Sequence, residues 1–339
     1  MSEKTTAGVI GLGLGRAHLA GYLADERVKV VGLADLDVGL AERTASEHGV
    51  PHAFSAYQDL LALEPDLVSV CLPNFLHAPV TIDGLDAGVH VMCEKPMALN
   101  ASQARDMAAA ARRNGRFLMI ALNNRFRAET QILKKLVEQD VLGEIYYAKT
   151  GWLRRSGIPG AGTWFTRKAQ AGGGPLIDLG VHMIDLARWL MGNPRPVSVV
   201  GATYARLSDS AEGVFDVEDL AAAFIRFEGD ATLVAETSWA SHVASEGSYV
   251  KLMGTLGGAE ITGNDLTVYT ELHGEQVDVT PAYAPREWSD CIAAEIAHFV
   301  DCIRAGRSPM STGEQGVEIM QILDGIYESA ADNRMVRIG

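Results

Sequence analysis

The first third of the chain alternates short apolar segments with helical patterns, and this alternation restricts the fold more than any other feature. The segments with the length and apolarity of buried strands are 7–11, 28–34, 67–72, 89–93 and 117–122. Strand–helix alternation at these lengths is typical of a parallel sheet with right-handed helical crossovers. The sequence therefore predicts a doubly wound α/β domain over residues 1–122.

A glycine-rich turn joins the first of these strands to its helix. Gly11, Gly13 and Gly15 follow the strand, and a helical pattern continues to about Ala24. Backbone N–H groups in such a turn can approach a pyrophosphate at the start of a helix, where a Cβ atom would block the approach. Arg16 stands where the commonest motif has its third glycine, so the motif is incomplete. We expect a dinucleotide site here, with Leu14 among its contacts.

Asp35 ends the second strand, 24 residues after Gly11. A carboxylate at this place suits hydrogen bonds to an adenosine ribose, and its charge would repel a 2′-phosphate. Neither Leu36 nor Asp37 supplies the arginine that NADP favours. We therefore expect NAD, with NADP the less favoured cofactor. The alternative is that Asp35 caps the next helix, which Asp37 could do equally well.

The strand at 89–93 stops at Glu94-Lys95-Pro96. Proline has no backbone N–H to donate, so the strand cannot continue through Pro96, and Lys95 is left at the carboxyl-terminal edge of the sheet. Ligands of open α/β sheets bind at this edge. The alternative is an ordinary solvated Glu–Lys pair at the end of a strand.

The pattern changes after residue 122. It predicts helix from Asn123 to about Val141, a strand at 144–151, a helix at 175–191, mainly strands from 196 to about 279, and helices at about 287–305 and 313–331. Residues 123–339 are therefore predicted to form an α+β domain for substrate binding and oligomerisation. Its last helices are able to pack back on the first domain. An apolar outer face on its sheet would indicate a homodimer or homotetramer.

A second chemical signal lies on the predicted helix at 175–191. Asp178 and His182 are four residues apart, so they share one face of a helix. The functional interpretation is a histidine acid/base supported by a carboxylate, because histidine titrates near neutral pH. The alternative is a pair that stabilises the helix by about 0.2–0.5 kcal/mol. Gly172-Gly173-Gly174 precedes this helix and would let the backbone approach a ligand.

Composition argues against several classes of partner. A net charge of −14 disfavours nucleic acid and anionic membranes, which would repel the surface at long range. No apolar run approaches the roughly 20 residues that span a bilayer, and the N-terminus has no signal-peptide pattern. The four cysteines show no C-x-x-C spacing and the histidines are scattered, so no metal is expected. We expect a cytoplasmic protein.

Four motifs stand in order along the chain: Gly11-x-Gly13-x-Gly15-Arg16-Ala17-His18, Pro73-Asn74-x-x-His77, Glu94-Lys95-Pro96 and Gly172-Gly173-Gly174-x-x-x-Asp178-Leu179-Gly180-x-His182-x-x-Asp185. Together they resemble the Gfo/Idh/MocA family of oxidoreductases, over essentially the whole chain. The resemblance implies a Rossmann domain followed by a C-terminal α+β domain with a large, mostly antiparallel open sheet. It also implies an NAD(P)-dependent dehydrogenase acting on the CH–OH group of a sugar, inositol or related polyol.

The resemblance also implies roles for single residues. The catalytic residues would be Lys95, Asp178 and His182, and the cofactor contacts would be the glycine turn, Asp35, Pro73, Asn74, His77, Glu94 and Lys95. Candidate substrate contacts, besides Asp178 and His182, are Asn124, Arg125, Arg154, Arg155 and Trp164. Two alternatives share the fold: an NAD-dependent enzyme that cleaves glycosides without net redox change, and a non-catalytic NAD-binding sugar sensor.

Overall fold

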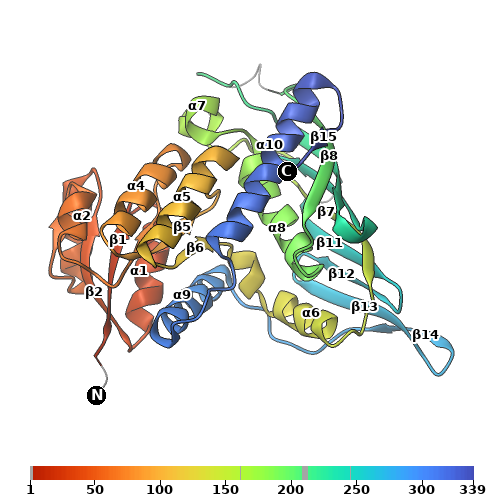
Figure 1. Ribbon diagram of the computed structural model, residues 1–339, viewed down its shortest axis with the longest axis horizontal. Helices are drawn as coiled ribbons and strands as arrows, with labels where there is room; N and C mark the ends of the chain where they lie inside the picture. The colour runs from red at the N-terminus through yellow and green to blue at the C-terminus, as the bar shows by residue number, and fades with distance from the viewer. Residues whose placement is uncertain (1–2, 161, 208–212, 245) are drawn as a thin grey trace. The chain divides into compact units, whose positions relative to one another are not determined.

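The computed structural model describes residues 3–160, 162–207, 213–244 and 246–339 and divides into two compact units. The first unit comprises Met1–Ala98, Ser102–Phe126 and Arg286–Val317. The second comprises Leu99–Ala101, Arg127–Pro285 and Glu318–Gly339. Each unit is built on its own sheet, and the chain can be followed by colour in Figure 1.

The described part of the first unit contains a six-stranded parallel sheet with the order β3-β2-β1-β4-β5-β6. Its strands are β1 (Thr5–Ile10), β2 (Val28–Ala34), β3 (Ala53–Phe54), β4 (Leu67–Val70), β5 (His90–Glu94) and β6 (Leu118–Ala121). The intervening helices are α1 (Gly15–Ala24), α2 (Val38–His48), α3 (Tyr57–Leu61), α4 (Asn74–Asp86) and α5 (Ala101–Asn114). The strand order changes direction between β1 and β4, which confirms the doubly wound prediction. The turns after these two strands therefore lie at the switch point, where such sheets bind ligands.

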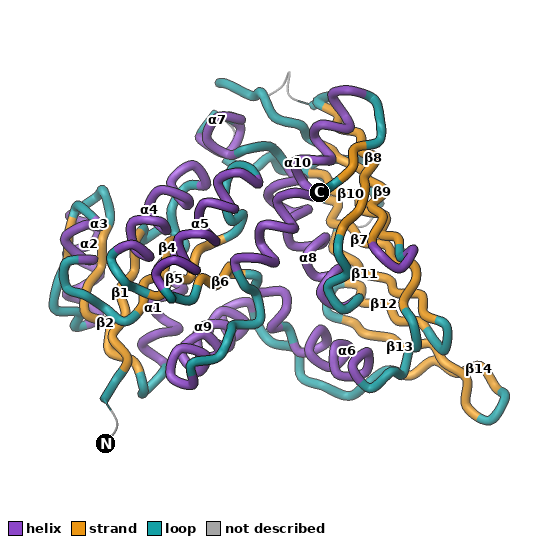
Figure 2. The backbone as a smooth tube through the Cα atoms, viewed as in Figure 1, coloured by secondary structure: helices purple, strands orange, loops and turns teal. Residues whose placement is uncertain are grey.

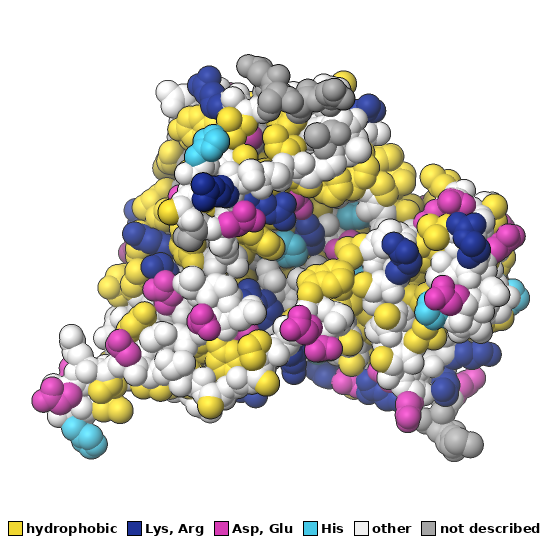
Figure 3. Space-filling model, turned by 180° about the vertical axis from the view of Figure 1, so that it is seen from behind, with side chains coloured by type: hydrophobic (Ala, Val, Ile, Leu, Met, Phe, Trp, Pro, Cys, Tyr) yellow, Lys and Arg dark blue, Asp and Glu magenta, His cyan; other side chains and the backbone are white. Residues whose placement is uncertain are grey.

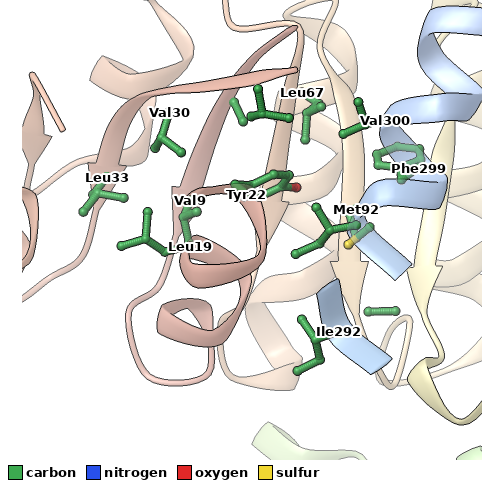
Figure 4. Close-up of a cluster of buried hydrophobic side chains, with 14 of the residues drawn as sticks. Val9, Leu19, Tyr22, Val30, Leu33, Leu67, Met92, Ile292, Phe299 and Val300 are labelled. Carbon is green, nitrogen blue, oxygen red and sulfur yellow. The ribbon is translucent and has the colours of Figure 1, made fainter. Parts of the chain in front are cut away.

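The core of the first unit lies between the sheet and two helices, α1 and α9 (Trp288–Ala305). Figure 4 shows Leu19 and Tyr22 of α1 close to strand side chains such as Val9, with Ile292 and Phe299 coming from α9. All of these side chains are almost completely buried. α1 and α9 approach closely because Gly21 has no side chain; a Cβ atom there would lie 2.5 Å from Ile296 Cδ1.

The described part of the second unit contains a nine-stranded sheet with the order β14-β13-β12-β11-β7-β10-β9-β8-β15. Its strands are β7 (Ile145–Leu153), β8 (Pro196–Tyr204), β9 (Leu220–Phe227), β10 (Thr232–Ser238), β11 (Gly247–Gly254), β12 (Gly258–Thr262), β13 (Asp265–Leu272), β14 (Glu275–Val279) and β15 (Val336–Arg337). β7 and β10 pair in parallel, and the other neighbouring strands are antiparallel. The prediction of a large, mostly antiparallel sheet is therefore confirmed.

Helices cover one face of this sheet, as the tube in Figure 2 shows for α8 (Val181–Leu190). Ile326 of α10 (Gly313–Asp332) packs against β8 at Gly201, on the same unit. The remaining helical segments are η1 (Asn123–Phe126), α6 (Ala128–Glu138), η2 (Trp164–Thr166), α7 (Lys168–Ala171), η3 (Leu176–Gly180) and η5 (Glu228–Asp230). Within the described ranges, no helix combines the length and apolarity needed to cross a membrane.

Two predicted helices are each divided. The predicted helix at 123–141 is a 3₁₀ turn, η1, followed by α6. The predicted helix at 175–191 begins with a π-helical turn, η3, in which the N–H of Val181 donates to the carbonyl of Leu176. The turn packs against β10, and an added Cβ atom at Gly180 would be 3.0 Å from Leu176 Cδ1 and in ordinary contact, at 3.4 Å, with Thr237 Cγ2. Asp178 thus lies in the π turn and His182 in α8, and π turns are frequent at functional sites.

Candidate functional site

The glycine turn after β1 has backbone that is open at Gly13. An added Cβ atom at Gly13 would meet no protein atom within 4 Å, whereas one at Gly11 would lie 2.4 Å from the carbonyl oxygen of Cys71. Gly11 also has a φ of +87°, which favours glycine. Gly15 provides the close approach of α1 to the sheet, with its added Cβ only 2.8 Å from Val9 Cγ1. Arg16 is exposed, so its place in the motif does not obstruct helix packing.

Asp35 is fixed to this turn by its carboxylate. Oδ2 accepts a hydrogen bond of 2.7 Å from the N–H of Leu12, and Oδ1 accepts one of 2.9 Å from the N–H of Asp37. The cap of α2 is Asp37, which accepts from the N–H of Leu40 at 3.0 Å. The alternative that Asp35 caps this helix is therefore wrong. Open backbone at Gly13 beside an anchored acid fits the pyrophosphate and ribose of a dinucleotide.

Glu94 is a buried carboxylate that precedes Lys95 and is bonded to its backbone. Its Oε1 lies 2.9 Å from His18 Nε2, and its Oε2 accepts a hydrogen bond of 3.1 Å from the N–H of Lys95. Burial alone would raise the pKa of Glu94, but the hydrogen bond and charge of His18, with the charge of Lys95, hold it below its ordinary value. A solvated Glu94–Lys95 pair, the alternative from the sequence, is therefore wrong for Glu94.

His77 holds the other side of the Lys95 segment. Its Nδ1 lies 2.7 Å from the carbonyl oxygen of Pro96, and its Nε2 lies 2.7 Å from that of Leu72. Burial lowers the pKa of His77, although the two carbonyl groups oppose this effect. The turn after β4 is thus tied to the segment after β5, and the buried Asn74 begins α4 beside it. It stays a prediction that the cofactor is contacted by Pro73, Asn74 and His77.

The pairing of Glu94 gives a testable pH dependence. Because the pKa of Glu94 is lowered on folding, its contribution to stability is present above about pH 4.5, the ordinary value, and is lost as the pH falls through the folded value. We expect the unfolding temperature of the wild type to fall more steeply below pH 4.5 than that of Glu94→Gln. Thermal unfolding by circular dichroism between pH 7 and pH 3 measures this difference, and parallel curves would contradict the assignment.

In the second unit, two tryptophans accompany the predicted catalytic pair. Trp239 is fully buried, and its Nε1–H donates a hydrogen bond of 2.9 Å to Asp178 Oδ2. The ring of Trp152, on β7, lies 6.2 Å from the ring of His182, and the guanidinium of Arg154 lies 5.8 Å from the Trp152 ring. The structure thus groups Asp178 with Trp239, and His182 with Trp152 and Arg154. This arrangement holds an imidazole and an oriented carboxylate on neighbouring turns.

The three glycines before this helix serve internal packing, and the expectation that they bring backbone to a ligand finds no support in these contacts. An added Cβ atom would lie 1.9 Å from Tyr327 Oη at Gly173 and 1.9 Å from the carbonyl oxygen of Glu218 at Gly174. The carboxylate of Glu218 accepts from the N–H groups of Gly174 and Leu176 at 2.9 and 3.0 Å. Burial raises the pKa of Glu218, while these donors oppose the increase. Glu218 therefore anchors the turn that precedes Asp178.

The other candidate substrate residues have different surroundings. Arg125 is fully buried and donates to the carbonyl of Met310 at 2.5 Å and to Gln315 Oε1 at 2.8 Å, which gives it a structural role in the first unit. Trp164 stacks on Phe165 with 4.0 Å between ring centroids, Asn124 is half-buried in η1, and Arg155 is exposed. Whether these residues contact substrate stays a prediction. Among the described residues, no group of three or more His, Cys, Asp or Glu side chains could hold a metal ion.

The groups that support the predicted catalytic residues do not stand out in the sequence. His18 stands within the first motif without a role of its own, and Ser69, Trp152 and Trp239 lie outside the four motifs. The available signal was polar chemistry within apolar segments: a buried tryptophan N–H usually needs an acceptor, and a buried histidine or serine usually needs partners. Which acceptor such a group finds depends on tertiary contacts, such as that of Trp239 with Asp178.

Comparison with known proteins links both units to one group of enzymes. A family model described as "Oxidoreductase family, NAD-binding Rossmann fold" matches residues 5–122, and one described as "Oxidoreductase family, C-terminal alpha/beta domain" matches residues 134–338. D-glucoside 3-dehydrogenase of Escherichia coli (strain K12) is 32% identical, over 99% of this chain and 98% of the relative.

Solved structures agree with this fold. GenD2 from gentamicin A biosynthesis, in complex with NAD, has a TM-score of 0.84 and 28% identity, over 100% of this chain and 97% of the other. A levoglucosan dehydrogenase structure has a TM-score of 0.91 over 100% of both chains, at 24% identity, and it shows the fold alone.

Proposed function

The chain belongs to the Gfo/Idh/MocA family of oxidoreductases, and from this premise we propose that it is an NAD-dependent dehydrogenase of a secondary hydroxyl on a sugar, inositol or related polyol. The observation that carries the proposal is the glycine turn, open at Gly13 and flanked by the anchored Asp35. The similarity to a D-glucoside 3-dehydrogenase supports a sugar as the substrate.

NAD is the cofactor that the site favours. The N-terminus of α1 directs N–H groups and a positive dipole end toward the place of a pyrophosphate, and Leu14, at the N-cap position, has no side-chain acceptor to compete for them. Asp35 would accept hydrogen bonds from an adenosine ribose and repel the 2′-phosphate of NADP. When bound, oxidised NAD supplies the acceptor for a hydride.

The chain's own residues would handle the proton and the developing charge. His182 would accept the proton of the substrate's hydroxyl group while the carbinol carbon of the substrate loses its hydrogen as a hydride. Asp178, oriented by Trp239, would support the imidazolium that results. Lys95 would donate a hydrogen bond to the reacting oxygen and stabilise its alkoxide character. Lys95 lies in the first unit, and Asp178 and His182 lie in the second. That the three residues act on one substrate is therefore part of the proposal.

A substrate panel tests the proposed reaction. Purified protein is incubated with inositols, aldoses, alkyl glucosides and sugar acids, each with NAD and in parallel with NADP, and absorbance at the reduced-nicotinamide band is recorded. Accumulation of NADH with a polyol or sugar supports the dehydrogenase. Release of sugar from a glycoside without NADH accumulation would instead support redox-neutral glycoside cleavage, and binding without turnover would support a sensor.

We further propose that the chain forms a homodimer or homotetramer through the outer face of the second unit's sheet. Val200, Phe224 and Val234 are paired neighbours on β8, β9 and β10, on the face opposite the buried Ile225 and Leu233. Such an apolar group on a sheet face is typical of an interface. On the face drawn in Figure 3, basic and acidic side chains are intermixed among the residues shown, which disfavours a polyanionic partner there. A cytoplasmic location stays a prediction of the sequence.

Introducing a charge into this apolar group should dissociate the oligomer. Phe224 is 44% exposed in the isolated chain, and in the interface the Glu of Phe224→Glu would be buried without a partner. We expect the wild type to have the mass of a dimer or tetramer by light scattering and Phe224→Glu to shift toward the monomer. Leu23→Glu, at a side chain 45% exposed on α1, is the matched control and should leave the mass unchanged. A monomeric wild type would refute the proposal.

A further inference from the structure

A chain of buried polar groups extends from the core of the first unit to the backbone of Lys95. Tyr22 Oη lies 2.7 Å from Ser69 Oγ, Ser69 Oγ lies 3.0 Å from His18 Nδ1, and His18 Nε2 lies 2.9 Å from Glu94 Oε1. The four residues come from α1, β4 and β5 and are at most 8% exposed. Figure 4 places the Tyr22 ring among the apolar side chains of the core. Lys95 follows directly, because its N–H donates to the second oxygen of Glu94.

Every polar side-chain atom along this chain of hydrogen bonds has a partner within 3.1 Å. The carboxylate of Glu94 can only accept, so the Nε2–H of His18 donates to it. Nδ1 of His18 and the hydroxyl groups of Ser69 and Tyr22 then complete the chain as hydrogen-bond partners of one another. Hydrogen bonds connected in this way polarise and strengthen one another.

The position of this hydrogen-bonded chain suits a role in fixing the backbone of Lys95 rather than a role in conducting protons. Its far end is Tyr22, which is 1% exposed, so it does not deliver protons to solvent. Burial raises the pKa of the Tyr22 hydroxyl far above its ordinary value, which keeps it a donor at every physiological pH. The other end of the hydrogen-bonded chain is the peptide N–H of Lys95, and the bond from this group to Glu94 fixes the direction of the backbone there. His18 itself lies in the first turn of α1, the helix that begins at the glycine turn.

We propose that His18 is a positioning residue for Lys95, acting through Glu94 and linking the cofactor-binding helix α1 to the catalytic lysine. The inference rests on the proposed function, because it assigns Lys95 a role at the reacting oxygen. Loss of the His18–Glu94 bond frees the carboxylate that holds the Lys95 peptide. Displacing a positioned group by about 1 Å can cost about 100-fold in rate.

The test compares two amides at position 18. The side-chain nitrogen of glutamine can occupy the place of Nε2 and still donate to Glu94, whereas asparagine is shorter and reaches only the place of Nδ1. We expect His18→Asn to lower kcat by about 10- to 100-fold with less than about a threefold change in the KM for NAD. His18→Gln should keep kcat within about threefold of the wild type. Equal kcat values for His18→Asn and the wild type would overturn the inference.

A second variant keeps the test independent of the stability of His18→Asn. Tyr22→Phe removes only the hydroxyl that begins the chain, and it should fold while lowering kcat by a smaller factor than His18→Asn. A purely structural role would lower the unfolding temperature of these variants and leave kcat unchanged, and that result would also overturn the inference. Lys95→Ala separates the two proposals. If Lys95→Ala retains turnover, the proposed role of Lys95 fails. If Lys95→Ala loses turnover while His18→Asn keeps the kcat of the wild type, only the proposed role of His18 is refuted.

Discussion

Replacing Lys95 or His182 with alanine is expected to lower kcat by about 100- to 10,000-fold while NAD still binds. Lys95→Ala removes the donor to the reacting oxygen, and His182→Ala removes the group that accepts the hydroxyl proton. Lys95 is only half-buried, so its truncation opens no large cavity. His182 is 9% exposed, so its truncation leaves a void, and thermal unfolding is measured beside the rates to show that the variant folds. Steady-state rates on the substrate found in the panel, together with NADH binding by fluorescence, measure both expectations.

Matched controls exist for both substitutions. Lys29→Ala removes an exposed lysine from β2 of the first unit, and His273→Ala removes an exposed histidine after β13 of the second, so both should retain wild-type turnover. The double variant of Lys95 and His182 tests whether the two act on one substrate, because residues that act as a unit are non-additive. Strictly multiplicative losses, or near-wild-type turnover in either single variant, would refute the joint assignment.

Gly13→Ala is expected to weaken NAD binding by at least about tenfold without changing the fold. The added methyl group meets no protein atom within 4 Å, so the unfolding temperature should stay within about 2 °C of the wild type. The same methyl group would stand where a pyrophosphate must approach the backbone. Isothermal titration with NAD and thermal unfolding of the apoprotein are the two measurements.

Gly11→Ala provides the contrasting variant two residues away. Its methyl group would lie 2.4 Å from the carbonyl oxygen of Cys71, at a φ of +87°, so this variant should be destabilised by about 1–3 kcal/mol. Loss of stability in Gly11→Ala together with loss of NAD affinity in Gly13→Ala locates the cofactor on the open side of the turn. Unchanged NAD affinity in Gly13→Ala would remove the main support for the proposed site.

Much of the fold could be predicted because its signals are local in the chain. The alternation of apolar strands with helices and the mainly strand pattern of the later chain each depend on short segments, and the two sheets confirm this fold class. The divided helix at 175–191 could not be predicted in the same way. Its π turn packs against β10, a strand that is distant in sequence.

The order of residues along the chain already indicates which chemical groups are available: the glycine turn, Asp35 and Lys95 follow strands, and Asp178 and His182 share one helical segment. Motif order and spacing are properties of the chain, so they also indicated the family. What holds these groups in place depends on the tertiary structure. It paired Glu94 with His18 and Asp178 with Trp239, and it made Asp37 rather than Asp35 the helix cap. A buried polar group must find its partner across the core, and folding selects that partner from distant parts of the chain.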